Sequence, residues 1–326
     1  MRIAINGMGR IGRLLFKLLS EKKEFEIVAV NELMSAENLH YLIRYDSISG
    51  AYHQEITLKD EVLSIPGNSI QVLHIEDPEQ LPWKEMNIDL VVECTGRFTT
   101  YALTEKHIKA GAKKVLLSTT GSEEIPLVIR GLNDDILSMP QAILCSGGCM
   151  TNCSSSIISP LLRAYGIHSI HINVLHAYTS RQSLVDGANK NFRRGRASST
   201  SIIPVEIDLA ETLERLFPET SGKITATSTR VPVLCGALAD FSIVLDKKVH
   251  TDEINELYHN AAGQSLKNIL DYTNDPIVSA DIIGNPHSAI FDATLTKTLK
   301  NHIKIGAWFD NEFGYTNRLA EIVGVL

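Results

Sequence analysis

Residues 2–12, RIAINGMGRIG, decide how the first half of the chain is interpreted. A short apolar run ends at Asn6, and three glycines follow it at the spacing G-x-G-x-x-G, namely Gly7, Gly9 and Gly12. In this pattern the first glycine permits a tight turn, the second lets a pyrophosphate approach the backbone, and the third lets a helix pack closely on the strand. The stretch therefore predicts a strand, a turn and a helix that together bind a dinucleotide.

An acidic residue at the end of the next predicted strand extends this pattern. That strand covers residues 26–31, and Glu32 follows it directly. A carboxylate at this place hydrogen-bonds the ribose hydroxyls and repels a 2′-phosphate, so it favours NAD over NADP. The helix would begin near Arg10 and Ile11, and its first N–H groups would face the pyrophosphate. We therefore predict an NAD site at this turn, and a glycine-rich turn without a ligand is the alternative.

Short apolar runs alternate with amphipathic runs through the first half of the chain. The predicted strands are residues 2–6, 26–31, 88–94, 114–118 and 142–145, and the predicted helices are residues 10–21, 36–44 and 102–110. This alternation predicts a parallel sheet with helices on both faces. Thr95, Gly96 and Ser118 follow the ends of two strands, where such sheets collect ligands, although simple turns explain these residues equally well.

The pattern changes after about residue 150. Long alternating segments predict a mostly antiparallel sheet with one covered face, and they lie at residues 168–178, 237–246, 289–297 and 303–309. Helices near residues 206–216 and 251–265 would cover that face. We therefore predict an α/β protein with a parallel-sheet nucleotide-binding domain over residues 1–149 and an α+β catalytic domain over residues 150–311.

Composition narrows the classes of function. The chain has 326 residues, of which 44% are hydrophobic, and its net charge of −7 argues against general nucleic-acid binding. No apolar run approaches the roughly 20 residues that span a bilayer, and the first residues lack the features of a signal peptide. Five cysteines without a secretion signal indicate free thiols in a reducing, cytoplasmic compartment. No nearby histidine completes a metal-ligand set with Cys145, Cys149 and Cys153, so no metal site is predicted.

Cys149 is the candidate nucleophile. It lies in the stretch GGCMTNC, residues 147–153, between a predicted strand and a predicted helix over residues 154–165. A thiol at the amino terminus of a helix is expected to have a lowered pKa. Taken alone, such a turn is more often structural than catalytic, so the hypothesis requires a base. His176, near the end of a predicted strand, is the candidate base, but sequence spacing alone cannot pair the two residues.

The chain resembles the glyceraldehyde-3-phosphate dehydrogenase family through motifs that occur along nearly its whole length. In order, they are INGMGRIGR, VNE, ECTG, CMTNC, HAYT, LVDG, RRGRA, SIIP, RVPV and WFDNEFGYTNR. The resemblance implies a Rossmann-type nucleotide domain, to which a last helix at about residues 312–326 returns. It also implies a homotetramer in which residues 178–201 form a loop packed between subunits beside NAD.

The same resemblance implies a covalent mechanism. Cys149 would attack an aldehyde carbon, while His176 takes the thiol proton and steadies the developing oxyanion. Hydride would pass to NAD, and an acceptor would release the remaining thioester. Asn311 would orient the nicotinamide amide, and Tyr315 would lie near the same pocket.

The resemblance further assigns the substrate's phosphate to a hydroxyl and a guanidinium, those of Thr179 and Arg230. Arg181 lies where the family often has a threonine, and it either strengthens this phosphate site or is a surface charge. Ala188 lies where NAD-specific relatives often carry proline, which leaves room for tolerance of NADP.

Four departures from the family pattern gather on the side of the acyl acceptor. Gly148 and Met150 flank the nucleophile where the family has serine and threonine, and Ile207 and Asp208 replace threonine and glycine. Hydroxyls are lost, and the added carboxylate would repel a phosphate by about 1–4 kcal/mol at roughly 4 Å. We therefore predict weakened use of inorganic phosphate and release of the acyl group by water or another acceptor. The alternative is that backbone N–H groups still bind phosphate adequately.

Three functions follow from these observations. The first is NAD-dependent oxidation of a phosphorylated aldose, foremost glyceraldehyde 3-phosphate. The second is an erythrose-4-phosphate dehydrogenase that releases its product by hydrolysis. The third is an NAD-binding paralogue that acts through protein partners, and the presence of Cys149, His176 and Asn311 together argues against it.

Overall fold

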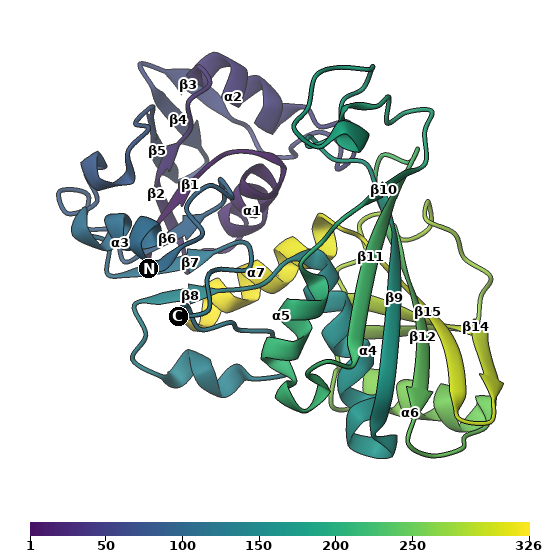
Figure 1. Cartoon of the computed structure of the whole chain (residues 1–326). Coiled ribbons are helices and arrows are strands. Elements are labelled where there is room, and N and C mark those ends of the chain that lie inside the picture. Colours follow the sequence, from purple (N-terminus) through teal and green to yellow (C-terminus); the bar gives the residue numbers. More distant parts are fainter. The chain divides into compact units, whose positions relative to one another are not determined.

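The segment that begins the chain folds as predicted in the computed structural model, which describes residues 1–326 (Figure 1). Its elements are β1 (Arg2–Asn6), α1 (Arg10–Ser20) and β2 (Glu26–Asn31). The two strands pair in parallel, and every residue of β1 after Arg2 is buried. A parallel pair of strands joined by a helix is the repeating unit of dinucleotide-binding sheets.

Two of the three glycines in the turn are required by close packing. Gly7 has φ of +91°, and its N–H donates to the Asn31 carbonyl at 2.8 Å. A Cβ on Gly12 would lie 2.0 Å from the Gly7 carbonyl oxygen. Because no larger residue fits there, Gly12 allows α1 to start directly against the end of β1.

The first sheet has eight strands in the order β3-β4-β5-β2-β1-β6-β7-β8. The remaining strands are β3 (Thr57–Lys59), β4 (Val62–Ile65), β5 (Asn68–Leu73), β6 (Leu90–Glu93), β7 (Lys114–Leu117) and β8 (Ile143–Cys145), and the helices are α2 (Ala36–Arg44) and α3 (Tyr101–Lys109). Neighbouring strands pair in parallel along the part of the sheet with the order β5-β2-β1-β6-β7-β8, which confirms the predicted parallel sheet. The prediction did not include the antiparallel edge formed by β3 and β4, because strands of three or four residues carry little periodicity.

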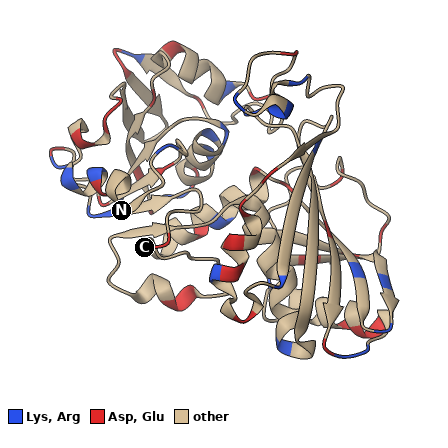
Figure 2. Cartoon of the chain, viewed as in Figure 1, with Lys and Arg blue, Asp and Glu red and all other residues tan.

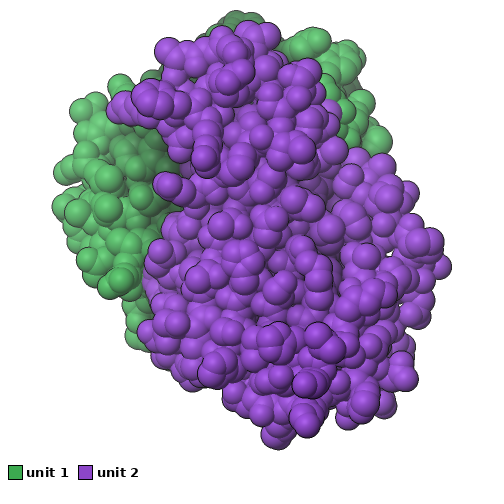
Figure 3. All heavy atoms as spheres, turned by 45° about the vertical axis from the view of Figure 1, so that its right-hand side comes forward, with its two compact units in different colours: residues 1–129, 133–148, 316–326 green, residues 130–132, 149–315 purple.

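The first sheet belongs to one of two compact units, which Figure 3 colours separately. Unit 1 contains residues 1–129, 133–148 and 316–326. Its last segment lies in α7 (Phe313–Val325), and Leu319, Ala320, Ile322 and Val323 are buried in the same apolar core as the residues of β1. The carboxyl-terminal residues therefore complete the core of a unit that begins at the amino terminus.

Unit 2 contains residues 130–132 and 149–315 and is built on a seven-stranded sheet of order β10-β11-β9-β12-β15-β14-β13. Its strands are β9 (Ile167–Ala177), β10 (Ile203–Val205), β11 (Ile224–Val231), β12 (Ala237–Leu245), β13 (Leu270–Thr273), β14 (Ala289–Leu299) and β15 (His302–Phe309). Four of the six pairings are antiparallel, and two, β9 with β11 and β13 with β14, are parallel. The sheet is therefore mixed, with the predicted antiparallel majority.

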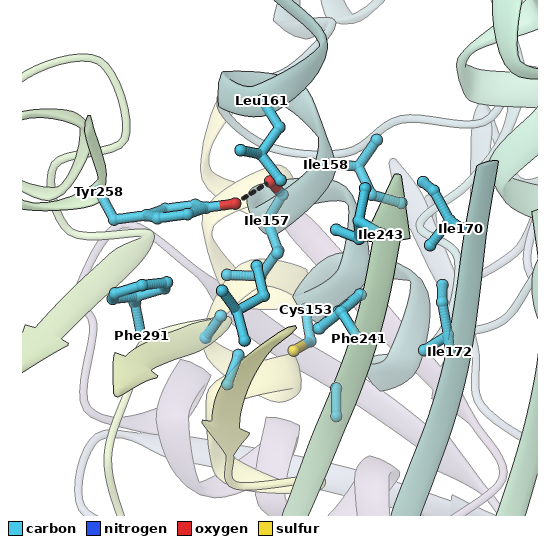
Figure 4. Packing of buried hydrophobic residues seen from close by; sticks show 14 of the residues in the cluster. Cys153, Ile157, Ile158, Leu161, Ile170, Ile172, Phe241, Ile243, Tyr258 and Phe291 are labelled. Carbon is cyan, nitrogen blue, oxygen red and sulfur yellow. Dashed lines mark hydrogen bonds between the residues drawn. The ribbon is translucent and has the colours of Figure 1, made fainter. Parts of the chain in front are cut away.

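Three helices form the apolar core of unit 2 with this sheet, namely α4 (Cys149–Tyr165), α5 (Leu209–Leu216) and α6 (Thr251–Gly263). Alternate residues of the strands, such as Ile170 and Ile172 on β9, point into this core (Figure 4). Four short 3-10 helices lie between the other elements of the two units, namely η1 (Pro78–Gln80), η2 (Asp134–Ser138), η3 (Phe192–Gly195) and η4 (Pro218–Thr220). None of the helices has the length and apolar character needed to cross a membrane.

Tyr258 joins α6 to α4 through the only polar atom of its side chain. The side chain is fully buried, its hydroxyl donates to the Ile157 carbonyl at 2.7 Å, and its ring stacks on Phe291 with centroids 4.1 Å apart (Figure 4). The ring therefore contributes apolar packing, and the hydroxyl satisfies a carbonyl of α4 inside the core.

We expect Tyr258→Phe to lower the free energy of unfolding by about 1 kcal/mol, because it removes one buried hydrogen bond and leaves the ring stacking in place. Urea denaturation followed by circular dichroism measures this difference. Tyr41→Phe is the matched control, since Tyr41 is 58% exposed, and it should leave the stability unchanged. Equal stabilities of the Tyr258 variant and the native protein would contradict the contribution assigned to the hydroxyl.

Candidate active site

Cys149 is the first residue of α4, directly after Gly147 and Gly148. Its Sγ lies 3.7 Å from Nε2 of His176, within the limit for a hydrogen bond to sulfur. Cys153, one helical turn later, is fully buried in the apolar core and has no such partner. The structure therefore brings together the two residues that sequence spacing alone could not pair.

His176 lies near the end of β9 and is 3% exposed. Its Nδ1 is 2.7 Å from the Ala177 carbonyl oxygen, which only accepts hydrogen bonds. Nδ1 therefore carries the ring proton of the neutral imidazole, and Nε2 presents a lone pair to the Cys149 sulfur. The Phe309 ring meets the imidazole edge-on with centroids 6.0 Å apart and helps to hold its orientation. This tautomer suits a general base.

The expectation that the helix terminus lowers the pKa of Cys149 was wrong. Burial raises the pKa of the thiol to about 11, although Arg230 and the backbone N–H groups of Met150 and Cys149 act in the opposite direction. Burial also lowers the pKa of His176 to about 3, and Arg230 lowers it further. Loss of water opposes charge on both groups, so it favours a neutral thiol beside a neutral imidazole.

Arg230 brings a buried positive charge to this pair. It lies on β11 directly opposite His176 of β9, and only 7% of its surface is exposed. Its Nη1 is 3.5 Å from the Ala177 carbonyl, its Nε has no hydrogen-bond partner, and no carboxylate forms an ion pair with it. Burial lowers the pKa of the guanidinium to about 10. A buried cation without an anionic partner is the feature expected of an anion-binding site.

The loop after β9 adds further donors without partners. The Thr179 N–H and hydroxyl donate to Oε1 of Gln182 at 2.9 and 3.0 Å, which leaves the buried Nε2 of Gln182 unpaired. Nη1 of Arg194 is also buried and unpaired. Burial is the main cause of the lowered pKa of Arg230, and the charges of Arg194 and the exposed Arg181 lower this pKa further. The three guanidinium groups therefore lie in one region. The prediction missed Gln182 and Arg194, although the RRGRA motif contained a signal for the second.

Asn311 and Tyr315 are both buried in unit 2. Oδ1 of Asn311 accepts the Gly236 N–H at 2.9 Å, which fixes the plane of its amide. The neighbouring Asp310 accepts from the N–H groups of Glu312 and Phe313 at 2.8 Å and so closes the turn before α7. The amide orientation of Asn311 is therefore set by backbone contacts within unit 2.

The glycine-rich turn of unit 1 opens on a cavity of about 240 Å³ at the carboxyl ends of β1, β2 and β6. Of the predicted cofactor residues, Gly7, Gly9, Glu32 and Thr95 line it, whereas Arg10, Ile11, Gly12, Gly96 and Ser118 do not. The lining residues that sequence analysis did not select are Asn6, Asn31, Leu33, Ile75, Glu76, Cys94, Arg97 and Phe98. Most of them lie at strand ends or in the loops that follow, and the sequence pattern does not predict the conformation of such loops.

The geometry of this turn fits a dinucleotide. A Cβ on Gly9 would meet no heavy atom within 4 Å, so this backbone is open to a phosphate group. Glu32 accepts the N–H groups of Met8 and Leu33 at 2.8 Å, which holds its carboxylate beside the turn. The side chain of Arg10 is paired with Asp46. No cluster of three or more metal-binding side chains is present.

A parallel sheet with a dinucleotide turn, together with a separate unit that holds a thiol beside a base, defines an NAD-dependent dehydrogenase with a cysteine nucleophile. Comparison with known proteins agrees. Residues 1–101 match the model of the glyceraldehyde 3-phosphate dehydrogenase NAD binding domain, and residues 148–311 match that of the C-terminal domain. The chain belongs to the glyceraldehyde-3-phosphate dehydrogenase family.

Similar proteins cover almost the full chain. Glyceraldehyde-3-phosphate dehydrogenase 2 of Bacillus subtilis is 38% identical over 325 residues, which are 99% of this chain and 96% of the relative. The glyceraldehyde-3-phosphate dehydrogenase of Mycolicibacterium smegmatis is 38% identical over 334 aligned positions, covering 100% of this chain and 98% of the relative. That of Clostridium acetobutylicum is 38% identical over 324 residues, with 98% and 96% covered.

The pKa of His176 makes a prediction about stability in acid. An unfolded histidine binds a proton below its ordinary pKa of about 6.5, whereas the folded imidazole stays neutral down to about pH 3. The unfolded state therefore binds more protons, and the folded state loses stability as the pH falls from about 6.5 towards 3. We expect His176→Asn to lose less stability than the native protein over this range, measured by urea denaturation between pH 7 and 4. Parallel losses in the two proteins would contradict the assignment.

Proposed function

We propose that the protein oxidises glyceraldehyde 3-phosphate with NAD through a covalent intermediate on Cys149. The observation that carries the proposal is the 3.7 Å contact between the Cys149 sulfur and Nε2 of His176, near the buried guanidinium of Arg230, whose Nε has no hydrogen-bond partner. A nucleophile, a base and an anion site together suit an aldehyde that carries a phosphate group. The names of the relatives support this substrate.

The first step joins the sulfur to the aldehyde carbon. As the S–C bond forms, the thiol proton passes to Nε2 of His176, and the carbonyl electron pair moves to oxygen. The new imidazolium donates from Nε2, and the N–H groups of Cys149 and Met150 lie at the start of α4, where helix N–H groups lack internal partners. The product of this step is the oxyanion of a hemithioacetal, and the proton remains on His176.

NAD, when bound, would accept a hydride from the carbon of the hemithioacetal. The oxidised group then remains on the sulfur as a thioester, and the proton held by His176 is lost before an acceptor attacks. Neutral His176 then deprotonates the acceptor, and the Cys149 thiolate leaves as the acyl group is released. Asn311, whose amide plane is fixed by Gly236, is assigned to the nicotinamide amide, with Tyr315 beside it.

The substrate's phosphate is assigned to Arg230, Thr179 and Arg181. Arg230 is the buried member of this set, and its Nε lacks a partner. Thr179 orients Gln182, whose free Nε2 adds a donor. Arg181 is exposed and forms no ion pair, so it is available to close over an anion. A phosphate would satisfy these donors together.

The acyl acceptor is assigned to water rather than inorganic phosphate. Met150 and Ile207 pack against the apolar core of unit 2, and Asp208 is an exposed residue at the start of α5 that makes no capping bond with its side chain. These residues offer no hydroxyl to an inorganic anion. Gly148 offers none either, although an added Cβ there meets no heavy atom within 4 Å.

We assign the protein to the cytoplasm as a homotetramer. All five cysteines are free thiols, which suits a reducing compartment. The loop after β9 exposes Leu184, Val185 and Phe192 at 63%, 77% and 88%, and η3 in this loop carries basic residues (Figure 2). Large exposed apolar side chains in one loop are typical of a subunit contact.

We expect NADH formation from glyceraldehyde 3-phosphate that inorganic phosphate or arsenate stimulates little, measured by absorbance. Cys149→Ser should abolish it, because the hydroxyl is a much weaker nucleophile. Gly148→Ser should increase the stimulation by phosphate, since it restores a hydroxyl. Strong stimulation of the native protein would refute water as the acceptor, and faster turnover of erythrose 4-phosphate would replace the proposed substrate.

Arg230→Gln should raise the KM for glyceraldehyde 3-phosphate by about tenfold or more, because a charged hydrogen bond to phosphate contributes roughly 1.5–3 kcal/mol. Unphosphorylated glyceraldehyde is the control substrate, and its KM should change far less. Arg181→Gln should act in the same direction with a smaller effect. Equal changes for both substrates would mean that Arg230 does not bind the phosphate.

A further inference from the structure

A buried carboxylate lies beneath the nucleotide cavity of unit 1. Glu93 ends β6 and is 2% exposed, and no lysine or arginine pairs with it. It accepts hydrogen bonds from the Thr95 N–H at 2.7 Å, from the Thr95 hydroxyl, from Nδ2 of Asn6 at 2.5 Å and from Nε2 of His107 at 3.1 Å. Four neutral donors therefore satisfy this buried charge in place of a cation.

The donor role of His107 is set by Trp83. Both side chains are fully buried, and the Trp83 indole N–H donates to Nδ1 of His107 at 3.0 Å. An indole nitrogen only donates, so Nδ1 must be the unprotonated, accepting nitrogen of a neutral ring. The proton then lies on Nε2, which donates it to Glu93. The tautomer of His107 thus follows from a residue that does not line the cavity.

A second arm of the network reaches Glu93 from the other side. The Ile75 N–H donates to Oδ1 of Asn31 at 2.9 Å, and Nδ2 of Asn31 donates to Oδ1 of Asn6 at 2.7 Å. Asn6 then donates to Glu93. Nδ2 of Asn31 also donates to the Ile75 carbonyl at 2.8 Å, so both backbone groups of Ile75 hold the Asn31 amide. The amides of Asn31 and Asn6 are therefore both oriented with their donors towards the next acceptor on the way to Glu93.

The network ends on the walls of the nucleotide cavity. Asn6, Asn31, Ile75 and Thr95 all line it. Thr95 also packs against the glycine-rich turn, since a Cβ on Gly7 would lie 2.7 Å from its Cγ2 and its N. The orientation of Glu93 therefore fixes the Thr95 wall, which contacts the turn, as well as the side chains at the ends of β1 and β2.

We propose that Trp83 and His107 are positioning residues for NAD: the indole N–H holds the His107 ring in place so that its Nε2–H donates to Glu93, which orients Glu93 and, through it, the Thr95 and Asn6 walls of the cavity. Without the indole donor, Nδ1 of the buried ring loses its hydrogen-bond partner, and the ring is no longer held against Glu93. The carboxylate then loses one of its four donors and shifts relative to the others. The cavity becomes less well organised before NAD enters it, which weakens binding.

The test is NAD affinity in the full chain without any aldehyde, so it does not depend on the proposed substrate. We expect Trp83→Phe, which keeps an aromatic ring and removes the donor, to weaken NAD binding about tenfold by titration calorimetry. Histidine ¹⁵N NMR should show the His107 Nδ1 signal shifting as this nitrogen loses its hydrogen bond. In turnover, the KM for NAD should rise while kcat and the KM for the aldehyde stay unchanged.

Tyr258→Phe is the matched control, because it removes one buried donor from an aromatic side chain in unit 2. It should lower the melting temperature without changing NAD affinity. If Trp83→Phe lowers the melting temperature similarly and keeps the native NAD affinity, the network is only structural and the proposal fails.

A pair of variants at His107 decides the question if Trp83→Phe does not fold. Glutamine carries one acceptor and one donor that cannot exchange a proton, so His107→Gln should keep NAD affinity within about twofold, by the hydrogen-bonding roles alone. His107→Leu removes both roles and should weaken NAD binding about tenfold. Equal affinities of the two variants, or loss of binding only in His107→Gln, would overturn the proposal.

Discussion

The contact between the Cys149 sulfur and His176 Nε2 depends on two elements, the start of α4 and the end of β9. Neither position is free to vary, since α4 packs its Ile157, Ile158 and Leu161 into the core that β9 lines with Ile170 and Ile172. Packing of apolar side chains along two elements therefore sets a polar contact at their ends. The neighbouring strand β11 adds a charge to this region, because it places Arg230 directly opposite His176 in the sheet.

Burial governs the chemistry of that site more than the helix terminus does. The terminus and Arg230 favour the thiolate, but the loss of water raises the pKa of Cys149 and lowers the pKa of His176.

Two groups of buried polar side chains differ in how their donors are satisfied. In unit 1, each donor of the Glu93 network has an acceptor, so the network is a finished part of the fold that holds strand ends in place. In unit 2, donors of Arg230, Gln182 and Arg194 are buried without partners. Because an unsatisfied buried donor costs free energy, a ligand that accepts from these groups would stabilise this part of unit 2.

The sequence by itself determined the parallel sheet, the glycine-rich turn, the antiparallel majority of the second sheet and the identity of the candidate nucleophile and base. These features depend on local periodicity and on glycine spacing, which the chain carries within short windows. Only the tertiary structure decided that Cys149 meets His176, that burial reverses the expected pKa shift, and that Gln182 and Arg194 bury donors without partners. Glu93 begins the ECTG motif, but its contact with His107, and that of His107 with Trp83, had no signal in the sequence. Contacts between distant residues and loss of water arise only when the chain packs, so no local pattern records them.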